Sequence, residues 1–149
     1  MPLAPQEIRT YFVTAVTASR RRLFQVDTNS ALLLDVLQEQ RSKQRLRLHS
    51  FVIMPDHIHL LLTPAPDISL EKSVQYIKGN FSFRLKSKLD VWERGYDSRR
   101  IQDGRDYTTH VHYIEQNPVR AGLVSEPKMH KHSSANPIHL TDSTPTHFA

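Results

Sequence analysis

Two strand-like segments joined by only two residues constrain the fold of this chain more than any other feature. Residues 46–54 (LRLHSFVIM) and 57–63 (HIHLLLT) are rich in apolar and β-branched side chains, and only Pro55 and Asp56 separate them. So short a connection is typical of a tight antiparallel hairpin. Pro64 follows, and proline cannot donate a hydrogen bond to a neighbouring strand. We therefore predict an antiparallel sheet built around this hairpin.

The segments around the hairpin predict further strands and helices. The aromatic and β-branched run at 11–17 (YFVTAVT) is typical of a strand, and residues 91–101 are expected to form short strands or an extended loop. Pro118 should limit the last helix, because the residue before a proline disfavours α geometry. Apolar residues recur at helical spacing in three segments: from Asn29 or Ser30 to about Arg41, from Asp67 or Ser69 to Leu85, and from Asp106 to Pro118.

The order strand, helix, hairpin, helix, strand, helix predicts an α+β fold. We expect a ferredoxin-like (RRM-like) antiparallel sheet with the helices packed on one face. A chain of 149 residues is long enough for one ordinary domain, which we place at residues 1–125. Residues 126–149 are rich in Pro, Ser, Thr, His and Asn, and we expect a polar tail that is mobile or loosely docked.

Composition narrows the functional classes. The chain has no cysteine, which excludes disulfides, Cys-based zinc sites and a thiol nucleophile. It has no apolar run of about 18 residues and no secretory leader, so we expect a cytoplasmic protein with no membrane partner. A formal net charge of +5 favours nucleic acid as the partner. Basic residues cluster at 20–22, 41–47 and 78–88, and these clusters could follow a phosphate backbone only if folding brings them together.

Two histidines, His57 and His59, stand two residues apart in the second strand of the hairpin. Alternate residues of a strand point to the same face, so the two imidazoles should lie side by side while Ile58, Leu60 and Leu62 enter a core. Neutral imidazole is a common ligand of divalent metals, and a rigid strand holds both donors in place. The same spacing also fits two surface histidines on the solvated face of a sheet.

The third predicted helix carries Tyr113 and Asn117 on one face, with His110 one turn before Tyr113. None of the three belongs to the apolar stripe of this helix. A tyrosine hydroxyl beside an imidazole and an amide oxygen can act as a nucleophile. By spacing alone, an amphipathic tyrosine at the core edge and an asparagine at the helix end is the simpler interpretation.

The segments MPDHIHLLLT (54–63) and VWERGYDSRRIQDGRDYTTHVHYIEQNPVRAGLV (91–124) together resemble the REP-associated tyrosine transposases. These are a branch of the single-tyrosine HUH endonucleases, which include small insertion-sequence transposases. The resemblance runs from about residue 11 to residue 134, and it implies that His57 and His59 are paired metal ligands and Tyr113 is the nucleophile. Related insertion-sequence enzymes take a third ligand from a Gln four residues after the tyrosine. Asn117 occupies that position here and is shorter by one methylene.

The resemblance implies a transposase that cleaves single-stranded DNA, near sites that form hairpins. Cleavage would use Mg²⁺ or Mn²⁺ and a 5′-phosphotyrosine intermediate, in a nucleoid-associated monomer or homodimer. Two other functions are alternatives. One is a His-x-His hydrolase, either a histidine-triad nucleotide hydrolase or a metallo-hydrolase, which would need a third histidine two residues on or an Asp-His continuation, where this strand has Leu61 and Leu62. The other is a non-catalytic single-stranded nucleic-acid-binding protein derived from a transposase. The expected DNA contacts are Arg120 near the active-site helix and four residues of the basic clusters, Arg20, Arg21, Lys78 and Arg84.

Overall fold

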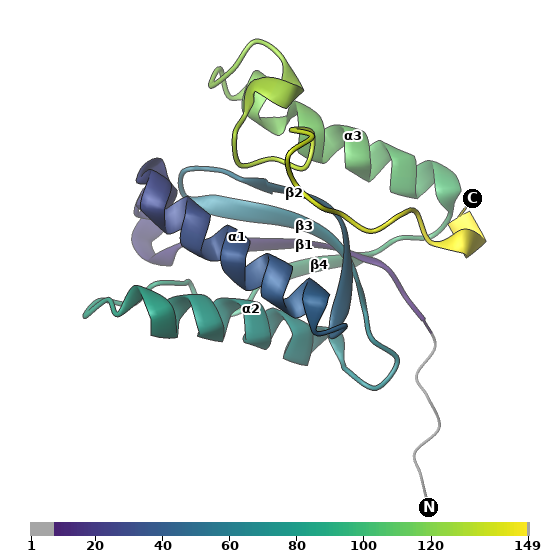
Figure 1. Ribbon diagram of the computed structural model, residues 1–149, viewed down its shortest axis with the longest axis horizontal. Helices are drawn as coiled ribbons and strands as arrows, with labels where there is room; N and C mark the ends of the chain where they lie inside the picture. Colours follow the sequence, from purple (N-terminus) through teal and green to yellow (C-terminus); the bar gives the residue numbers. More distant parts are fainter. Residues whose placement is uncertain (1–7, 149) are drawn as a thin grey trace, which may run out of the picture.

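The computed structural model describes residues 8–148, which form a four-stranded antiparallel sheet and three α-helices (Figure 1). The strand order is β2-β3-β1-β4, and the predicted α+β class with an antiparallel sheet is confirmed. No helix within these residues is long and apolar enough to cross a membrane. The elements are β1 (Tyr11–Val16), α1 (Asp27–Ser42), β2 (Leu46–Ile53), β3 (His57–Pro64), α2 (Leu70–Leu85), β4 (Asp97–Arg100) and α3 (Gly104–Arg120).

The predicted hairpin of β2 and β3 is present, and a bulge in β2 adjusts its faces. The strands pair antiparallel, and at the turn the Met54 amide donates to the His57 carbonyl at 2.8 Å. The register shifts between Leu48 and Ser50. Because successive residues of a strand point to opposite faces, an unbroken strand would send Leu48 and Phe51 to opposite sides. The extra residue of the bulge brings both into the same core.

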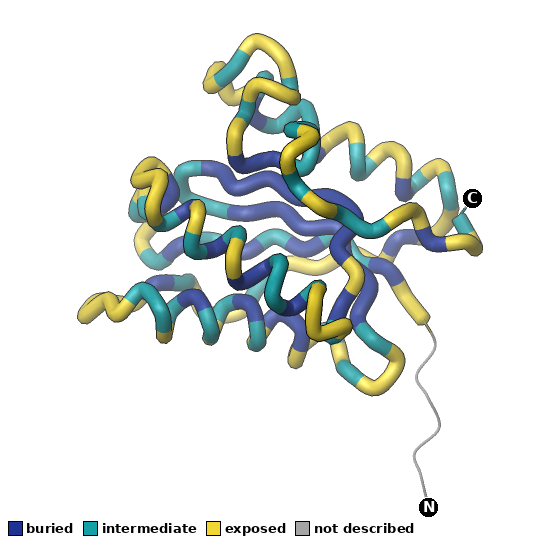
Figure 2. The backbone as a smooth tube through the Cα atoms, viewed as in Figure 1, coloured by how far each residue is buried: buried dark blue, intermediate teal, exposed yellow. Residues whose placement is uncertain are grey.

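Helices α1 and α2 cover one face of the sheet and bury the larger apolar core, which we call the main core (Figures 1 and 2). Helix α2 begins at Ser69, whose hydroxyl accepts a hydrogen bond from the Lys72 amide at 3.1 Å. Ser69 is one of the two residues at which we predicted this helix to begin. The main core takes Leu33, Val36 and Leu37 from α1, Val74, Ile77 and Phe81 from α2, and Val13, Ala15, Ile58, Leu60 and Leu62 from the central strands.

Helix α3 lies on the opposite face of the sheet, which corrects the prediction that the helices pack on one face (Figure 1). There Tyr107 and Ile114 pack with Val52, Met54 and Leu61 of the hairpin in a second, smaller core. These hairpin residues alternate with residues of the main core, so the hairpin is apolar on both faces. A strand buried on both faces has a continuous apolar run, and that run was the sequence signal for a helix on each side.

The ends of α3 also differ from the predicted ones. The N-terminal cap is Asp103 rather than Asp106: its carboxylate accepts a hydrogen bond from the Asp106 amide at 2.8 Å. Asp106 in turn accepts a hydrogen bond from the backbone N–H of the residue before the cap, a variation on the capping box, in which the cap itself is the donor. At the other end the helix continues through Pro118 to Arg120. Proline removes only one donor, and the Ala121 amide donates back to the last turn, so the helix survives.

The C-terminal segment, for which we predicted a mobile or loosely docked tail, lies along β2 and beside α3 (Figure 1). Three backbone hydrogen bonds join it to β2: Ile53 to His132 at 2.9 Å, Ser134 to Phe51 at 2.9 Å, and Asp142 to Leu48 at 2.7 Å. β2 is an edge strand, and these bonds pair backbone N–H and C=O groups on its outer side. Without them, these groups would be open to pairing with another chain. The domain boundary at residue 125 stays a prediction, and residues 1–7 and 149 lie outside the described residues.

Candidate active site

His57 and His59 lie at the start of β3 and face α3, away from the main core. Their ring centroids are 4.9 Å apart. Ile58 between them is buried in the main core, as strand alternation predicted. His59 is buried, whereas His57 is partly exposed at the end of the sheet. The sheet therefore holds two imidazoles side by side, one of them open to an approaching substrate.

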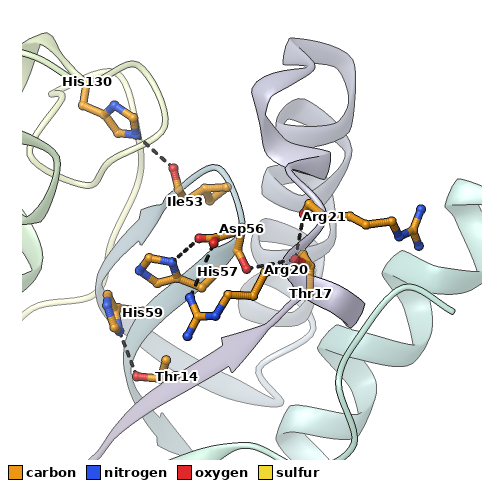
Figure 3. Close-up of polar contacts among 9 residues, drawn as sticks. All are labelled: Thr14, Thr17, Arg20, Arg21, Ile53, Asp56, His57, His59 and His130. Carbon is orange, nitrogen blue, oxygen red and sulfur yellow. Dashed lines mark hydrogen bonds and ion pairs between the residues drawn. The ribbon is translucent and has the colours of Figure 1, made fainter. Parts of the chain in front are cut away.

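His57 is oriented by the turn residue before it (Figure 3). Its Nδ1 lies 2.7 Å from Oδ1 of Asp56, and Arg20 approaches the other carboxylate oxygen at 3.4 Å. Burial raises the pKa of Asp56, but the hydrogen bond with His57 and the nearby positive charge outweigh burial and hold this pKa below its ordinary value. An ionised carboxylate only accepts hydrogen bonds, so Nδ1 of His57 carries the hydrogen. In the neutral form of the ring, Nε2 keeps a lone pair that is left for another partner.

His59 is oriented by the neighbouring strand. Its Nδ1 lies 2.8 Å from the hydroxyl of Thr14, which pairs with His59 across β1 and β3 (Figure 3). Burial lowers the pKa of His59 to about 3, and the charges of His57 and Arg120 add to this effect. The ring is therefore neutral near pH 7. Neither His57 nor His59 has a hydrogen-bond partner at Nε2 within residues 8–148, so both rings present the donor atom that metals bind.

Helix α3 brings Tyr113 to the histidine pair. The Tyr113 ring centroid lies 5.6 Å from that of His59, and Phe12 of β1 packs edge-on against Tyr113 at 5.8 Å. The guanidinium of Arg120 lies 4.3 Å from the centre of the Tyr113 ring, and its Nη2 donates to the Tyr113 carbonyl at 3.2 Å. Tyr113 nevertheless stays 40% exposed. The phenol is thus held on three sides and is still accessible.

Asn117 lies one helical turn after Tyr113 and is half-buried. Its side chain makes no hydrogen bond within the part of the chain that the structure describes. In that same part, no group of three or more His, Cys, Asp or Glu side chains could hold a metal. Any further protein ligand beside His57 and His59 would therefore have to be of another type, such as the Asn117 amide oxygen.

The fold separates the predicted DNA-binding residues. Arg20 reaches toward Asp56 and the histidines, whereas Arg21 points away from them and donates to the Asp90 carbonyl (Figure 3). Lys78 and Arg84 belong to α2, on the other face of the sheet. Lys78 donates to the carbonyls of Glu93 and Gly95 at 3.0 and 2.7 Å, and Arg84 forms an ion pair with Glu39 of α1. Their role in DNA binding stays a prediction that this placement does not favour.

Three residues of the site, Phe12, Thr14 and Asp56, were not predicted as members. Phe12 and Thr14 alternate along β1 with residues of the main core, so they face the histidines. Which strand lies beside β3, and in which register, is not encoded in a local pattern. For Asp56 the available signal was its position directly before the first histidine.

Comparisons with known proteins identify the family of this chain. The family model "Transposase IS200 like" matches residues 8–117, which include both histidines, Tyr113 and Asn117. A protein of Haemophilus influenzae, assigned as a REP-associated tyrosine transposase, is 30% identical over 145 residues, covering 83% of this chain and 78% of that protein. A REP-associated tyrosine transposase of Escherichia coli K12 is 27% identical over 118 residues, covering 78% of this chain and 70% of that protein.

Two solved structures share the fold at 22% sequence identity. The structure of a REP-associated tyrosine transposase bound to a REP hairpin superimposes with a TM-score of 0.77 and covers 97% of this chain and 90% of its own. A protein of Deinococcus radiodurans assigned as a transposase has a TM-score of 0.56, covering 78% of this chain and 95% of its own. The chain belongs to the IS200-like transposase family of enzymes, and within that family it resembles the REP-associated tyrosine transposases.

Proposed function

We propose that this transposase cleaves and rejoins single-stranded DNA, with Tyr113 as the nucleophile and a divalent metal, Mg²⁺ or Mn²⁺, at His57 and His59. One observation carries the proposal: the Tyr113 ring lies 5.6 Å from the ring of His59 and stays 40% exposed. The residue type that can form a covalent phosphoester thus stands beside the residue types that bind a metal.

The residues present fit a divalent ion. His57 and His59 would hold it, and the amide oxygen of Asn117 is the candidate third ligand. Imidazoles that bind a metal must be neutral, and the low pKa of His59 agrees with this requirement. The Nδ1 atoms of the two rings are hydrogen-bonded to Asp56 and Thr14, which leaves Nε2 of each ring for the metal. When bound, such an ion polarises the scissile phosphate and neutralises charge that develops on it.

The side chains of the protein perform the covalent step. The Tyr113 hydroxyl oxygen bonds to phosphorus as the bond from phosphorus to the 3′-oxygen breaks, leaving a 5′-phosphotyrosine and a free 3′-hydroxyl. Because the new phosphodiester keeps the energy of the old one, a DNA 3′-hydroxyl can attack it, join the strands and release Tyr113. Arg120 lies over the Tyr113 ring, where its guanidinium can donate to a phosphate oxygen.

The inferred DNA is single-stranded beside a hairpin. One relative with this fold is bound to a REP hairpin, and this chain has a groove and an exposed arginine beside its own histidines. Thr14 and Val16 line a groove of about 290 Å³ together with residues 93–97. Arg20 lies on the same side of the sheet, and its side chain is 64% exposed. A single strand could enter this groove, which reaches the histidines through Thr14, the hydrogen-bond partner of His59.

The test uses a pool of DNA hairpins flanked by random single strands, with Mg²⁺ or Mn²⁺. We expect a protein–DNA adduct on a denaturing gel, with the phosphodiester mapped to Tyr113 by mass spectrometry. The adduct should disappear in Tyr113→Phe and persist in Tyr107→Phe, a matched change on the same helix. An adduct that survives Tyr113→Phe would disprove this nucleophile. DNA binding without any adduct would favour the alternative that this chain binds single-stranded nucleic acid without catalysis.

A further inference from the structure

His110 lies one helical turn before Tyr113, and none of the steps above uses it. Its Nδ1 is 2.8 Å from the Asp106 carbonyl oxygen and 3.1 Å from the Asp106 carboxylate. The ring packs against Phe12 with centroids 4.9 Å apart, and its side chain is only 12% exposed. His110 is therefore an ordered imidazole, held on both sides, in the wall of the active site.

The hydrogen bonds of His110 determine which of its nitrogens can accept a proton. A carbonyl oxygen can only accept a hydrogen bond, so Nδ1 carries the hydrogen and Nε2 of the neutral ring keeps a lone pair. Asp106 is itself anchored, since its Oδ2 accepts from the Gln102 amide at 2.9 Å. Nε2 has no hydrogen-bond partner within residues 8–148. An acceptor nitrogen oriented by an anchored carboxylate is the usual arrangement of a general base.

His110 and Tyr113 belong to the same cluster of rings. Phe12 contacts both, at centroid distances of 4.9 Å to His110 and 5.8 Å to Tyr113. Residues three apart on a helix have Cβ atoms about 5–6 Å apart. Long side chains on a helix lean toward its N-terminus, and for Tyr113 this is the direction of His110. The other imidazoles of the site, His57 and His59, are committed to the metal in the proposed function.

We propose that His110 is the catalytic base that removes the phenolic proton of Tyr113, with Asp106 as its positioning residue. The DNA reaction it would assist rests on the proposed function. As the bond from Tyr113 oxygen to phosphorus forms and the bond to the 3′-oxygen breaks, the phenolic proton moves to Nε2 of His110. The departing 3′-oxygen takes a proton from water. On rejoining, the attacking 3′-hydroxyl gives its proton back to water as its oxygen bonds to phosphorus, and His110 returns its proton to the oxygen of Tyr113.

The first test needs neither DNA nor metal. An aryl sulfonyl fluoride forms a sulfur–oxygen bond with a phenol and releases fluoride, which requires the same proton removal. The full chain is labelled in EDTA, and modification of Tyr113 is followed by peptide mass spectrometry with Tyr76 as internal reference. We expect His110→Gln to slow labelling of Tyr113 about tenfold or more, and added imidazole to restore labelling in His110→Ala.

The matched control is His112→Gln, an exposed histidine of the same helix, which should leave the labelling rate unchanged. Thermal melting by circular dichroism verifies that each variant is folded. Equal labelling rates in His110→Gln and the unmodified protein would overturn the proposal. So would an equal loss in His112→Gln, or no labelling of Tyr113 in the unmodified protein.

A second test uses any oligonucleotide that the unmodified protein cleaves. His110→Gln should slow adduct formation about 100-fold and leave DNA binding intact. A 3′-bridging sulfur, which departs without a proton, should not restore the rate; restoration would mean that His110 protonates the leaving group instead. Labelling that depends on His110 without cleavage of any DNA would refute the proposed function alone. An unchanged rate of DNA cleavage in His110→Gln would refute only the proposal that His110 is the catalytic base.

Discussion

The two faces of the sheet use alternate residues of the same strands for different purposes. Under α1 and α2, Ile58, Leu60 and Leu62 of β3 are at most 1% exposed and belong to a continuous apolar core. Under α3, the same strand presents His57 and His59, and its own contribution to the second core comes only later in the strand, from Leu61. One face thus stabilises the fold, while the other is covered incompletely and leaves polar groups accessible.

The difference shows how an apolar face can position a polar one. The separation of 4.9 Å between the two imidazole centroids is a property of β3, and β3 is held in place by the main core on its reverse side. Residues that hold the strand need no contact with substrate. Substitutions on the two faces should therefore have separable consequences, for chemistry on one face and for folding on the other.

The largest expected effect is on the chemistry of the α3 face. We expect His57→Ala to reduce formation of the DNA adduct about 1,000-fold or more, because loss of a metal ligand removes several kcal/mol of charge stabilisation. Binding of the same oligonucleotide, followed by fluorescence anisotropy, and the free energy of unfolding should change little. His112→Ala is the matched control. Equal losses of binding and cleavage in His57→Ala would argue for a role in binding only.

The next effect is on stability and arises from the main core. Phe81 of α2 is fully buried, so Phe81→Ala should lower the free energy of unfolding by about 3–5 kcal/mol in urea denaturation. If the variant does not fold, Ile77→Val, expected to cost about 0.5–1.5 kcal/mol, takes its place. Where the protein remains folded, the rate of Tyr113 labelling should stay the same. A stability loss below these ranges would mean that the main core is less tightly packed than its burial indicates.

A third prediction uses the pH dependence of stability. The pKa of His59 is about 3 in the folded protein, below the ordinary value of 6.5, so below pH 6.5 the unfolded chain binds a proton that the folded protein does not. The contribution of neutral His59 to the free energy of unfolding is fully present above pH 6.5 and is lost as the pH falls toward 3. Metal-free protein should lose about 2–3 kcal/mol between pH 6.5 and 4.5.

Urea denaturation across this pH range measures the free energy of unfolding at each pH. His59→Gln should make this free energy depend less on pH. A residual slope should remain, because burial also lowers the pKa of His49, which lies at the bulge of β2. An unchanged slope in His59→Gln would show that His59 is protonated in the folded protein, contrary to its burial.

The smallest effects compare two arginines on opposite faces. Arg120→Ala should weaken binding of a hairpin oligonucleotide and reduce the slope of log affinity against log salt by about 0.7, as expected for one lost phosphate contact on a single strand. Arg84→Ala should leave DNA affinity unchanged and lower the free energy of unfolding by about 0.2–1 kcal/mol, through loss of its ion pair with Glu39. Equal weakening of DNA binding by both changes would show that DNA also contacts α2.

Local patterns were sufficient for much of the fold. The two-residue connection at Pro55 and Asp56 predicted the hairpin, and apolar spacing predicted the three helices within a few residues of their ends. Errors at the ends of α3 occurred where neighbouring hydrogen bonds outweigh the preference of a single residue. Pro118 lies inside α3 because the backbone of the following turn continues the hydrogen bonding of the helix. Asp103 rather than Asp106 caps the helix, because the Asp103 carboxylate accepts a hydrogen bond from the Asp106 amide.

The sequence by itself determined that His57 and His59 share a face and that His110, Tyr113 and Asn117 share another, because strand and helix periodicities are properties of the backbone. Only the tertiary structure decided that these two faces meet. An amphipathic helix specifies which of its sides is buried but not the surface that buries it. The placement of α3 opposite α1 and α2, the pairing of Thr14 with His59, and the removal of Lys78 and Arg84 from the site follow from packing between distant segments.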